Sequence, residues 1–352
     1  MSSAPRAIAH DTLLRLPKAE LHCHLDGSVR PQTLIELARE YGRAMPRATA
    51  PELGEFMTVR DAHNLEEYLA RFEVTLSVMQ RRDALERIAY ELVEDAHRDG
   101  VLYMEVRFSP VLNVKEGLSH SEIVEAVVRG LARAEKAFGV IGRVIVTALR
   151  NLSPDMSLEL ARLAVSFRDR GVVGFDLAGG ERGHPASRHA HAFEFARSHD
   201  MACTCHAGEG DGAASIREAV HACCANRIGH GTRLFEDPSL MDYVNDRRIP
   251  IEICLTSNVQ TRVASSYESH PLRQYYNSGL NVVLSTDNRL MSATTLTDEY
   301  AHAAEHLGFT LPQLAKIALN GFESAFLPWK ERLMLLARTR QTMAQLHVEP
   351  AQ

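Results

Sequence analysis

The chain has 352 residues, of which 45% are hydrophobic and 24% are charged, and its formal net charge is −6. This acidic balance argues against a nucleic-acid partner, which usually requires a basic face. No apolar stretch approaches the roughly 18 residues of a membrane span, and the N-terminus lacks the apolar core of a signal peptide. We therefore expect a cytoplasmic protein with no membrane partner, whose six cysteines are reduced and mostly buried.

Eight short apolar runs follow one another along the chain, and longer segments with helical periodicity, such as 118–139 and 156–171, lie between many of them. The predicted strands are 19–25, 101–108, 142–149, 172–178, 201–207, 226–231, 249–255 and 281–287. Alternating strands and helices indicate a parallel sheet, and eight repeats predict an α/β fold of the closed (β/α)₈ barrel type. An open doubly wound sheet is the alternative, but HLDGSVRP after the first strand supplies no Gly-rich phosphate loop.

The longest interval separates the first two predicted strands. Residues 26–100 are predicted to form extra helices, including 64–79 and 82–100. An insertion after the first strand of a barrel would lie over the barrel mouth, where binding sites are built. No linker rich in Gly, Ser or Pro divides the chain. We therefore expect one domain over residues 1–352, with a helical insertion at 26–100 over the mouth.

Polar residues gather at the carboxyl ends of several predicted strands, where barrel enzymes build their active sites. The first strand ends with His22, His24 and Asp26, which share one face because side chains alternate with a period of two. The later strand ends add His206, Glu209, His230, Asp287 and Asn288. Two histidines from one strand, one from another and a carboxylate form a ligand set suited to Zn²⁺, with an open position for water.

Each of these residues also has an ordinary structural interpretation. A lone histidine in an apolar strand is more often a hydrogen-bonded core group, and a lone aspartate such as Asp287 is often a helix N-cap. Three other polar residues within predicted strands are interpreted as partners in internal ion pairs or hydrogen bonds: Glu105, Arg107 and Asp176. The HAAEH pattern at 302–306 matches an inverted zincin motif, but it falls in a predicted helix and is interpreted as a solvated helix face.

Six short motifs fall in the order and spacing of the adenosine deaminase family, a branch of the amidohydrolase superfamily. The motifs are PKAELHCHLDGS, GFDLAGGE, HAGEG, RIGHG, CLTSNVQT and LSTDN, and the chain resembles the family from about residue 15 to residue 330. The family is a (β/α)₈ barrel that holds one zinc ion. The resemblance implies a zinc-dependent enzyme of purine nucleoside salvage that converts adenosine and 2′-deoxyadenosine to inosine and deoxyinosine, with release of ammonia.

The resemblance also implies a role for each residue at the strand ends. The implied zinc ligands are His22, His24, His206 and Asp287. Glu209 would be the proton donor, and His230 would position or deprotonate the water. Asp26 would bind the ribose 5′-hydroxyl and the backbone at Gly179 would bind the purine ring, while His24 and Asn288 also face the substrate.

The chemistry fits these residue types independently of the resemblance. Hydrolysis of an aromatic C–NH₂ group needs a strong nucleophile at neutral pH, which zinc supplies by lowering the pKa of water from 15.7 to about 7. A carboxylic acid three residues from a ligand, as Glu209 is, can protonate ring N1. None of the five lysines ends a predicted strand, so no carboxylated lysine bridges two metals and we expect one zinc ion per chain. The HxE and PCxxC motifs of cytidine deaminases are absent.

One position departs from the pattern of the family. Many members have a second aspartate after the zinc-binding one, where this chain has Asn288. Purine N7 only accepts hydrogen bonds, so an asparagine amide suits it, whereas an aspartate must be protonated. Two alternatives within the same chemistry are a deaminase of a 5′-modified adenosine, such as aminodeoxyfutalosine of the menaquinone pathway, and an adenine deaminase. A catalytically silent nucleoside-binding barrel is the alternative from another class, and neither oligomeric state nor lid function is predicted.

Overall fold

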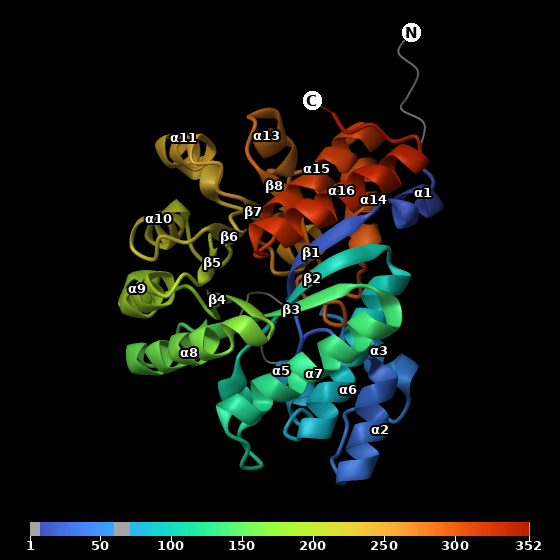
Figure 1. Ribbon diagram of the computed structural model, residues 1–352, viewed down its shortest axis with the longest axis vertical. Coiled ribbons are helices and arrows are strands. Elements are labelled where there is room, and N and C mark those ends of the chain that lie inside the picture. Colours follow the sequence, from blue (N-terminus) through green and yellow to red (C-terminus); the bar gives the residue numbers. More distant parts are fainter. Residues whose placement is uncertain (1–7, 60–70, 352) are drawn as a thin grey trace.

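The computed structural model describes residues 8–59 and 71–351, and within them eight parallel strands form one sheet in the order β1 to β8 (Figure 1). The strands are β1 Lys18–His24, β2 Val101–Phe108, β3 Ile141–Leu149, β4 Val172–Ala178, β5 Ala202–Ala207, β6 Arg227–His230, β7 Ile251–Ile253 and β8 Val282–Leu284. A parallel bridge between Cys23 and Asp287 joins the first strand to the chain just after the last. The predicted (β/α)₈ barrel is therefore confirmed.

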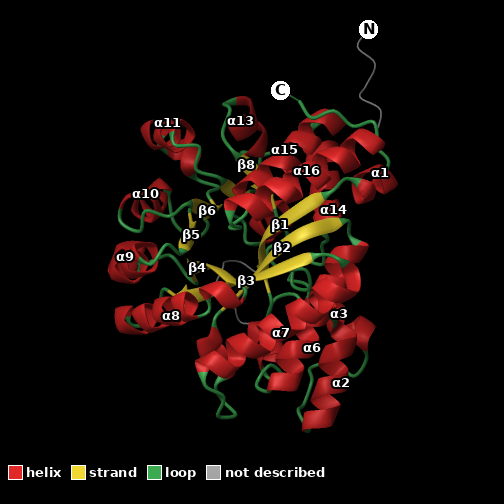
Figure 2. Cartoon of the chain, viewed as in Figure 1, coloured by secondary structure: helices red, strands yellow, loops and turns green. Residues whose placement is uncertain are grey.

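Helices surround the strands on the outside of the barrel (Figure 2). The α-helices are α1 His10–Arg15, α2 Pro31–Tyr41, α3 Ala50–Met57, α5 Phe72–Leu76, α6 Arg82–Arg98, α7 His120–Phe138, α8 Pro154–Ser166, α9 Ala190–Ser198, α10 Ala213–His221, α11 Pro238–Asp246, α12 Leu255–Gln260, α13 Leu272–Asn277, α14 Leu296–Leu307, α15 Leu311–Ser324 and α16 Trp329–Gln345. Short 3₁₀ helices are η1 Pro110–Asn113, η2 Arg168–Arg170, η3 Ala186–His189 and η4 Leu234–Glu236. Within the described residues, no helix combines the length and apolarity needed to cross a bilayer.

Local sequence explains where the predicted helices begin and end. Helix α7 starts at a capping box in which Ser119 and Glu122 satisfy each other's backbone N–H groups, and it ends at Gly139 in the left-handed conformation. The helix predicted at 156–171 is divided, because α8 ends at Ser166 and η2 follows it. Of the helix predicted at 64–79, residues 64–70 lie outside the described part of the chain, and in the remainder only Phe72–Leu76 is helical, as α5.

The last two strands are shorter than predicted. Strand β7 ends at Ile253 because the chain turns directly into α12, and β8 ends at Leu284. Asp287 therefore follows its strand rather than ending it, and it adopts a positive φ of 61°. His230, the last residue of β6, has a φ of 62°. Such angles are uncommon for residues other than glycine and are concentrated at functional sites, where the surrounding structure holds them.

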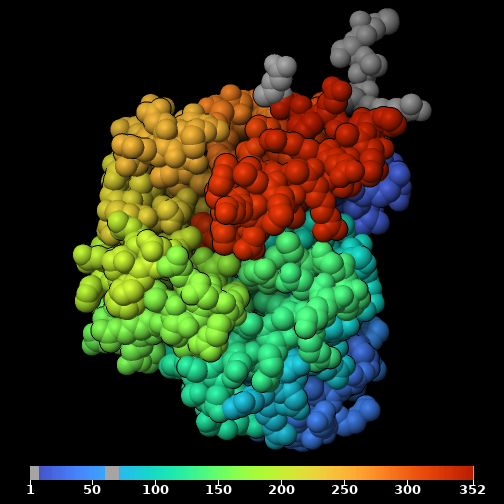
Figure 3. All heavy atoms as spheres, viewed as in Figure 1, coloured from blue at the N-terminus to red at the C-terminus, as the bar shows by residue number. Residues whose placement is uncertain are grey.

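The barrel interior contains buried ion pairs, which confirms the interpretation of the three internal polar residues. Arg107 lies 3.2 Å from Asp176 and 2.8 Å from Glu252, and Arg227 pairs with both Glu105 and Glu252. The blue surface of α1 borders the red surface of the C-terminal helices (Figure 3), and His10 of α1 lies 3.5 Å from Asp298 of α14. Five of the six cysteines are buried as predicted, and Cys224 is exposed.

Helices α2, α3, α5 and α6 occupy the interval predicted as an insertion. Arg30, the residue just before α2, connects that helix to α6, because its guanidinium lies 2.6 Å from Glu94 and 2.7 Å from Asp95. Backbone N–H of Val59 also donates to the carbonyl of Met291, at 2.9 Å, in the segment that follows β8. The assignment of 26–100 as an insertion within a single domain stays a prediction.

Glu299 in α14 provides a test of buried charge in this fold. Burial raises the pKa of its carboxyl group from 4.5 to about 7, so the native state binds this proton more tightly than the unfolded chain. Stability is therefore lost as the pH rises from about 4.5 to about 7. We expect Glu299→Gln to unfold like the parent at about pH 5 and to be more stable by about 1–3 kcal/mol at about pH 8, measured by denaturant unfolding.

The matched control for this substitution is Glu305→Gln, because Glu305 is exposed on the same helix. Its effect should be small and equal at both pH values. A stabilisation by Glu299→Gln that is the same at both pH values would show that ionisation of Glu299 is not its cause.

Candidate active site

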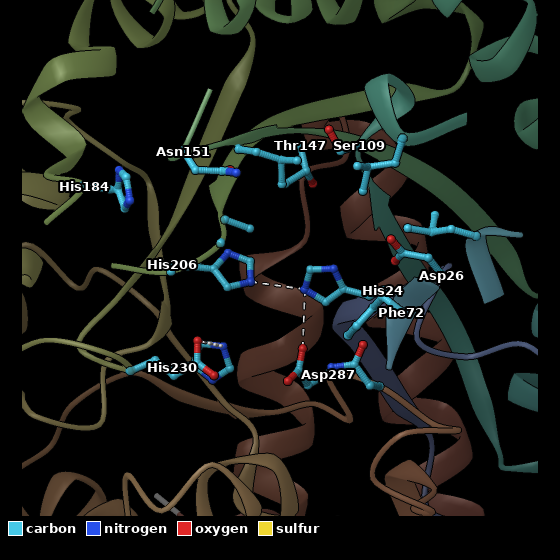
Figure 4. A pocket seen from close by; sticks show the side chains of 18 of the residues that line it. His24, Asp26, Phe72, Ser109, Thr147, Asn151, His184, His206, His230 and Asp287 are labelled. Atoms are coloured by element: carbon cyan, nitrogen blue, oxygen red, sulfur yellow. Dashed lines mark hydrogen bonds and ion pairs between the residues drawn. The ribbon is translucent and has the colours of Figure 1, made fainter. Parts of the chain in front are cut away.

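A cavity of about 470 Å³ opens at the carboxyl ends of the barrel strands (Figure 4). Eight of the nine predicted site residues line it: His24, Asp26, Gly179, His206, Glu209, His230, Asp287 and Asn288. The ninth, His22, is fully buried, and its ring centroid lies 4.5 Å from that of His206 and 4.8 Å from that of His230. The structure therefore gathers every predicted site residue into one place.

The four proposed metal ligands present their donor atoms to one another. His24 Nε2 lies 3.1 Å from His206 Nε2 and 3.4 Å from Asp287 Oδ1, and His22 Nε2 lies 3.5 Å from the same oxygen. A tetrahedral zinc site with bonds of about 2.0–2.1 Å places its ligand atoms about 3.3 Å apart. His22 Nε2 is buried and forms no hydrogen bond. The donor set and its spacing therefore fit a single zinc ion.

Buried carboxylates orient two of these imidazoles. His22 Nδ1 lies 2.8 Å from Glu252 Oε2, and His206 Nδ1 lies 3.2 Å from Asp176 Oδ1. Because an ionised carboxylate only accepts hydrogen bonds, each Nδ1 carries the ring proton. The unprotonated Nε2 of each ring therefore faces the centre of the cluster, as metal binding requires.

Arg107 holds both carboxylates. Burial alone would raise the pKa of Glu252, but the charges of Arg107 and Arg227 outweigh it and hold that pKa well below its usual range. For Asp176 the same burial is outweighed by His206 and Arg107, which lower its pKa. Both carboxylates are therefore ionised. Glu252 was not singled out from the sequence, although a lone acid within the apolar run IPIEICL is the signal that could have identified it.

Asp287 is held by backbone and side-chain contacts. Its backbone N–H donates to the His22 carbonyl at 2.8 Å, and its own carbonyl accepts from the His24 N–H at 2.7 Å. The Ser257 hydroxyl donates to Asp287 Oδ2 at 2.6 Å, which leaves Oδ1 toward the histidines. The positive φ of Asp287 is thus fixed by hydrogen bonds on both sides of the residue.

Glu181 holds the segment that carries Glu209. Its carboxylate accepts hydrogen bonds from the backbone N–H groups of Gly208, Glu209 and Asp211 at 3.1, 3.1 and 3.0 Å. Glu209 Oε2 then lies 3.4 Å from His230 Nε2. Glu181 was not singled out from the sequence, because the GFDLAGGE motif alone does not indicate what its last residue contacts.

The predicted substrate-binding residues lie at the same cavity with unused hydrogen-bonding capacity. Asp26 Oδ1 and Asn288 Oδ1 are buried and form no hydrogen bond, and burial raises the pKa of Asp26 to about 7. Gly27 is required beside them, since a Cβ at this position would lie 1.7 Å from Asn288 Oδ1. Gly179 has a φ of 95°, which favours glycine and exposes the backbone at the cavity wall.

The HAAEH segment lies in α14 and does not line this cavity. The prediction of a solvated face is correct for Glu305, which is exposed. The rings of His302 and His306 are only partly exposed, because they stack on Tyr267 with centroid distances of 4.4 and 4.9 Å. The difference arises because the loop after α12 returns across the helix, which the sequence pattern of α14 does not reveal.

The comparisons with known proteins agree with this site. A family model described as adenosine deaminase matches residues 17–342. An adenosine deaminase of Mycolicibacterium gilvum is 44% identical over 344 residues, covering 93% of this chain and 94% of the relative. An amidohydrolase from Burkholderia ambifaria with bound zinc has a TM-score of 0.89 at 26% identity, covering 98% and 96% of the two chains. An adenine deaminase from Arthrobacter aurescens has a TM-score of 0.87 at 27% identity, covering 93% and 99%.

The barrel and the side chains at its mouth are those of an amidohydrolase-type deaminase. The chain belongs to the adenosine deaminase family, because the family model spans most of its length and a relative is 44% identical over nearly the whole of both chains. It is therefore a hydrolytic enzyme of the purine aminohydrolase class. Among the described residues at the mouth, two overlapping groups place their ligand atoms close enough together to hold a metal ion: His22 with His24 and His206, and His22 with His230 and Asp287.

Asp176 and Glu181 should separate metal binding from turnover. Asp176→Asn removes the charge that orients His206, and we expect zinc affinity to fall about 10- to 100-fold. Glu181→Gln is the matched variant, since it disturbs the segment of Glu209 and leaves the ligands untouched, so zinc affinity should stay near that of the parent while turnover falls. Competition with a chromophoric chelator measures the affinity, and equal zinc affinities in the two variants would contradict the assignment.

Proposed function

We propose that this chain is a zinc-dependent adenosine deaminase, which hydrolyses adenosine and 2′-deoxyadenosine to inosine and deoxyinosine with release of ammonia in purine nucleoside salvage. The observation that carries the proposal is that a zinc-type ligand set, the Glu209 carboxylate and a buried acid with one open oxygen, Asp26 Oδ1, meet in one cavity. The 44% identity to an adenosine deaminase supports the choice of substrate.

His22, His24, His206 and Asp287 would hold one zinc ion. When bound there, zinc supplies a water molecule of lowered pKa and hence a strong nucleophile at neutral pH. A single ion is favoured because the ligands belong to one cluster, and because the buried Lys18, at the amino end of β1, donates to the carbonyls of Leu13 and Leu16 instead of facing the metal.

Glu209 and His230 are the proposed catalytic residues. Water adds to C6 of the purine while ring N1 takes up one of its protons. The C6–N bond then breaks as the proton left on the C6 hydroxyl passes to the departing amine, which leaves as ammonia and gives a C6 carbonyl. Glu209 delivers the proton to N1, a transfer typically worth about 10²- to 10⁴-fold in rate. His230 lies 3.4 Å from Glu209 and directs the attacking oxygen toward C6.

The remaining residues bind and orient the nucleoside. Asp26, whose Oδ1 forms no hydrogen bond within the protein, accepts the ribose 5′-hydroxyl. The backbone at Gly179 binds the purine ring, and the Asn288 amide donates to purine N7. A cavity of about 470 Å³ lies within the usual range for small-molecule sites, and Phe72 and Leu76 of α5 add an apolar wall on which a sugar or base can rest.

The proposal is tested by comparing kcat/KM for adenosine, 2′-deoxyadenosine, adenine and a 5′-substituted adenosine with the zinc-loaded enzyme in an ultraviolet assay. We expect adenosine and 2′-deoxyadenosine to reach about 10⁴ M⁻¹s⁻¹ or more and to exceed the other two compounds. Turnover of only the 5′-substituted compound or of only adenine would contradict the role of Asp26 and favour one of the alternative substrates. No turnover of any purine would favour a silent barrel.

Glu209→Gln is the control that ties turnover to the proposed acid. It should retain one zinc ion per chain while its turnover falls by about 10²-fold or more. His24→Ala should instead lose the metal, since it removes a ligand. Near-normal turnover of Glu209→Gln would exclude Glu209 as the proton donor.

A further inference from the structure

Three buried side chains and one backbone group form a line of hydrogen bonds that ends at His230. The backbone N–H of Leu272 donates to His270 Nδ1 at 3.1 Å. His270 Nε2 lies 3.1 Å from Asn258 Oδ1, and Asn258 Nδ2 lies 3.1 Å from His230 Nδ1. Asn258 is fully buried, and His230 and His270 are 1% and 3% exposed. Water therefore has little access to compete for these bonds.

The direction of every bond in this line follows from its first member. A backbone N–H can only donate, so His270 Nδ1 must be an unprotonated acceptor. Burial lowers the pKa of His270 to about 3, which keeps its imidazole neutral, so its single proton is on Nε2 and is donated to Asn258 Oδ1. The amide N–H₂ of Asn258 then faces His230 and can only donate. His230 Nδ1 is thereby an acceptor, and its proton lies on Nε2.

We propose that Asn258 and His270 are positioning residues that hold His230 as its Nε2–H tautomer. In the proposed hydrolysis, on which this inference rests, His230 then donates a hydrogen bond from Nε2 to the attacking oxygen and to Glu209, and it does not remove the proton of the water. In the proposed step the Glu209 carboxylate, whose Oε2 lies 3.4 Å from His230 Nε2, takes up that proton and transfers it to ring N1. One proton leaves water and one reaches the purine, so the step balances.

The hydrogen bonds from Leu272 through His270 and Asn258 disfavour the other tautomer of His230, in which the proton is on Nδ1. A proton on His230 Nδ1 would face the N–H₂ group of Asn258, so two donors would meet in a buried site with no acceptor between them. If the Asn258 amide were flipped, its N–H₂ group would face the Nε2–H donor of His270. If the His270 proton then moved to Nδ1, that N–H would face the backbone N–H of Leu272, which is also a donor. The backbone N–H cannot be reversed. Two backbone bonds also hold Asn258 in place: its N–H donates to the Cys254 carbonyl, and its carbonyl accepts from the Ala264 N–H, both at 2.9 Å.

The direct test is ¹⁵N NMR of the zinc-loaded protein with labelled histidine, in which the ring signals of His230 are assigned by their absence in His230→Gln. We expect a protonated nitrogen at Nε2 and an unprotonated nitrogen at Nδ1 between about pH 6 and pH 9. A proton on Nδ1 in the free enzyme would overturn the proposal. Because no substrate is present, this result is independent of whether adenosine is the substrate.

Asn258→Asp tests the consequence for catalysis. A carboxylate only accepts, so it should draw the His230 proton to Nδ1 in the NMR spectrum and lower kcat by more than about 10-fold, while KM changes less than about 3-fold and zinc content stays unchanged. His270→Gln should largely retain the tautomer and kcat, because a glutamine amide can replace Nε2–H as the donor to Asn258. An unchanged tautomer and kcat in Asn258→Asp would overturn the proposal.

A control separates positioning from the cost of burying a carboxylate. Asn320 in α15 is also buried, with its Nδ2 donating to the Val282 carbonyl at 3.1 Å. Asn320→Asp should lower stability without changing the His230 tautomer or kcat per folded molecule. A loss of kcat in Asn258→Asp that only matches its loss of folded protein, as measured against this control, would show a structural role alone and contradict the proposal.

Discussion

The guanidinium of Arg107 lies fully buried between the carboxylates of Asp176 and Glu252, and the geometry of the candidate metal site depends on this contact. Each carboxylate accepts a hydrogen bond from the Nδ1 of one histidine. Arg107, which holds both carboxylates, therefore fixes the orientation of the His206 and His22 rings. Removing one member of such a buried network leaves an uncompensated charge, which typically costs about 3–5 kcal/mol. The barrel thus uses charged residues in its interior to orient ligands at its mouth.

Hydrogen-bond direction is the common principle of the site. Carboxylates fix the proton of His22 and of His206 on Nδ1 and leave Nε2 for a metal. The Asn258 amide imposes the opposite tautomer on His230, so its Nε2–H faces Glu209. Neighbouring imidazoles of similar sequence context therefore have different chemistry, because different partners lie behind them. In the network around Arg107 and Arg227 the carboxylates outnumber the guanidinium groups, which favours a cation at the adjacent histidines.

The sequence predicted the barrel and singled out nine residues that the structure gathers at its mouth, because the strand pattern and the short motifs are local signals, while the roles of these residues stay predictions. It did not predict Glu252, Glu181 or the pair of Asn258 and His270, since their roles depend on contacts between segments far apart in the chain. The end of β8 was also misplaced: STDN continues an apolar run, but the strand ends at Leu284, and Asp287 pairs with β1 only through an isolated parallel bridge to Cys23. Hydrogen bonds between distant segments thus determine these features, and the periodicity of the sequence does not reveal such bonds.

The central claim is that one metal ion is bound by His22, His24, His206 and Asp287, and anomalous diffraction at the zinc edge from crystals of the zinc-loaded protein tests it most directly. The account predicts a single peak at the barrel mouth, about 2.0–2.1 Å from three imidazole Nε2 atoms and one Asp287 oxygen. Two peaks within the cavity, or zinc bound only at His302 and His306 of α14, would contradict it.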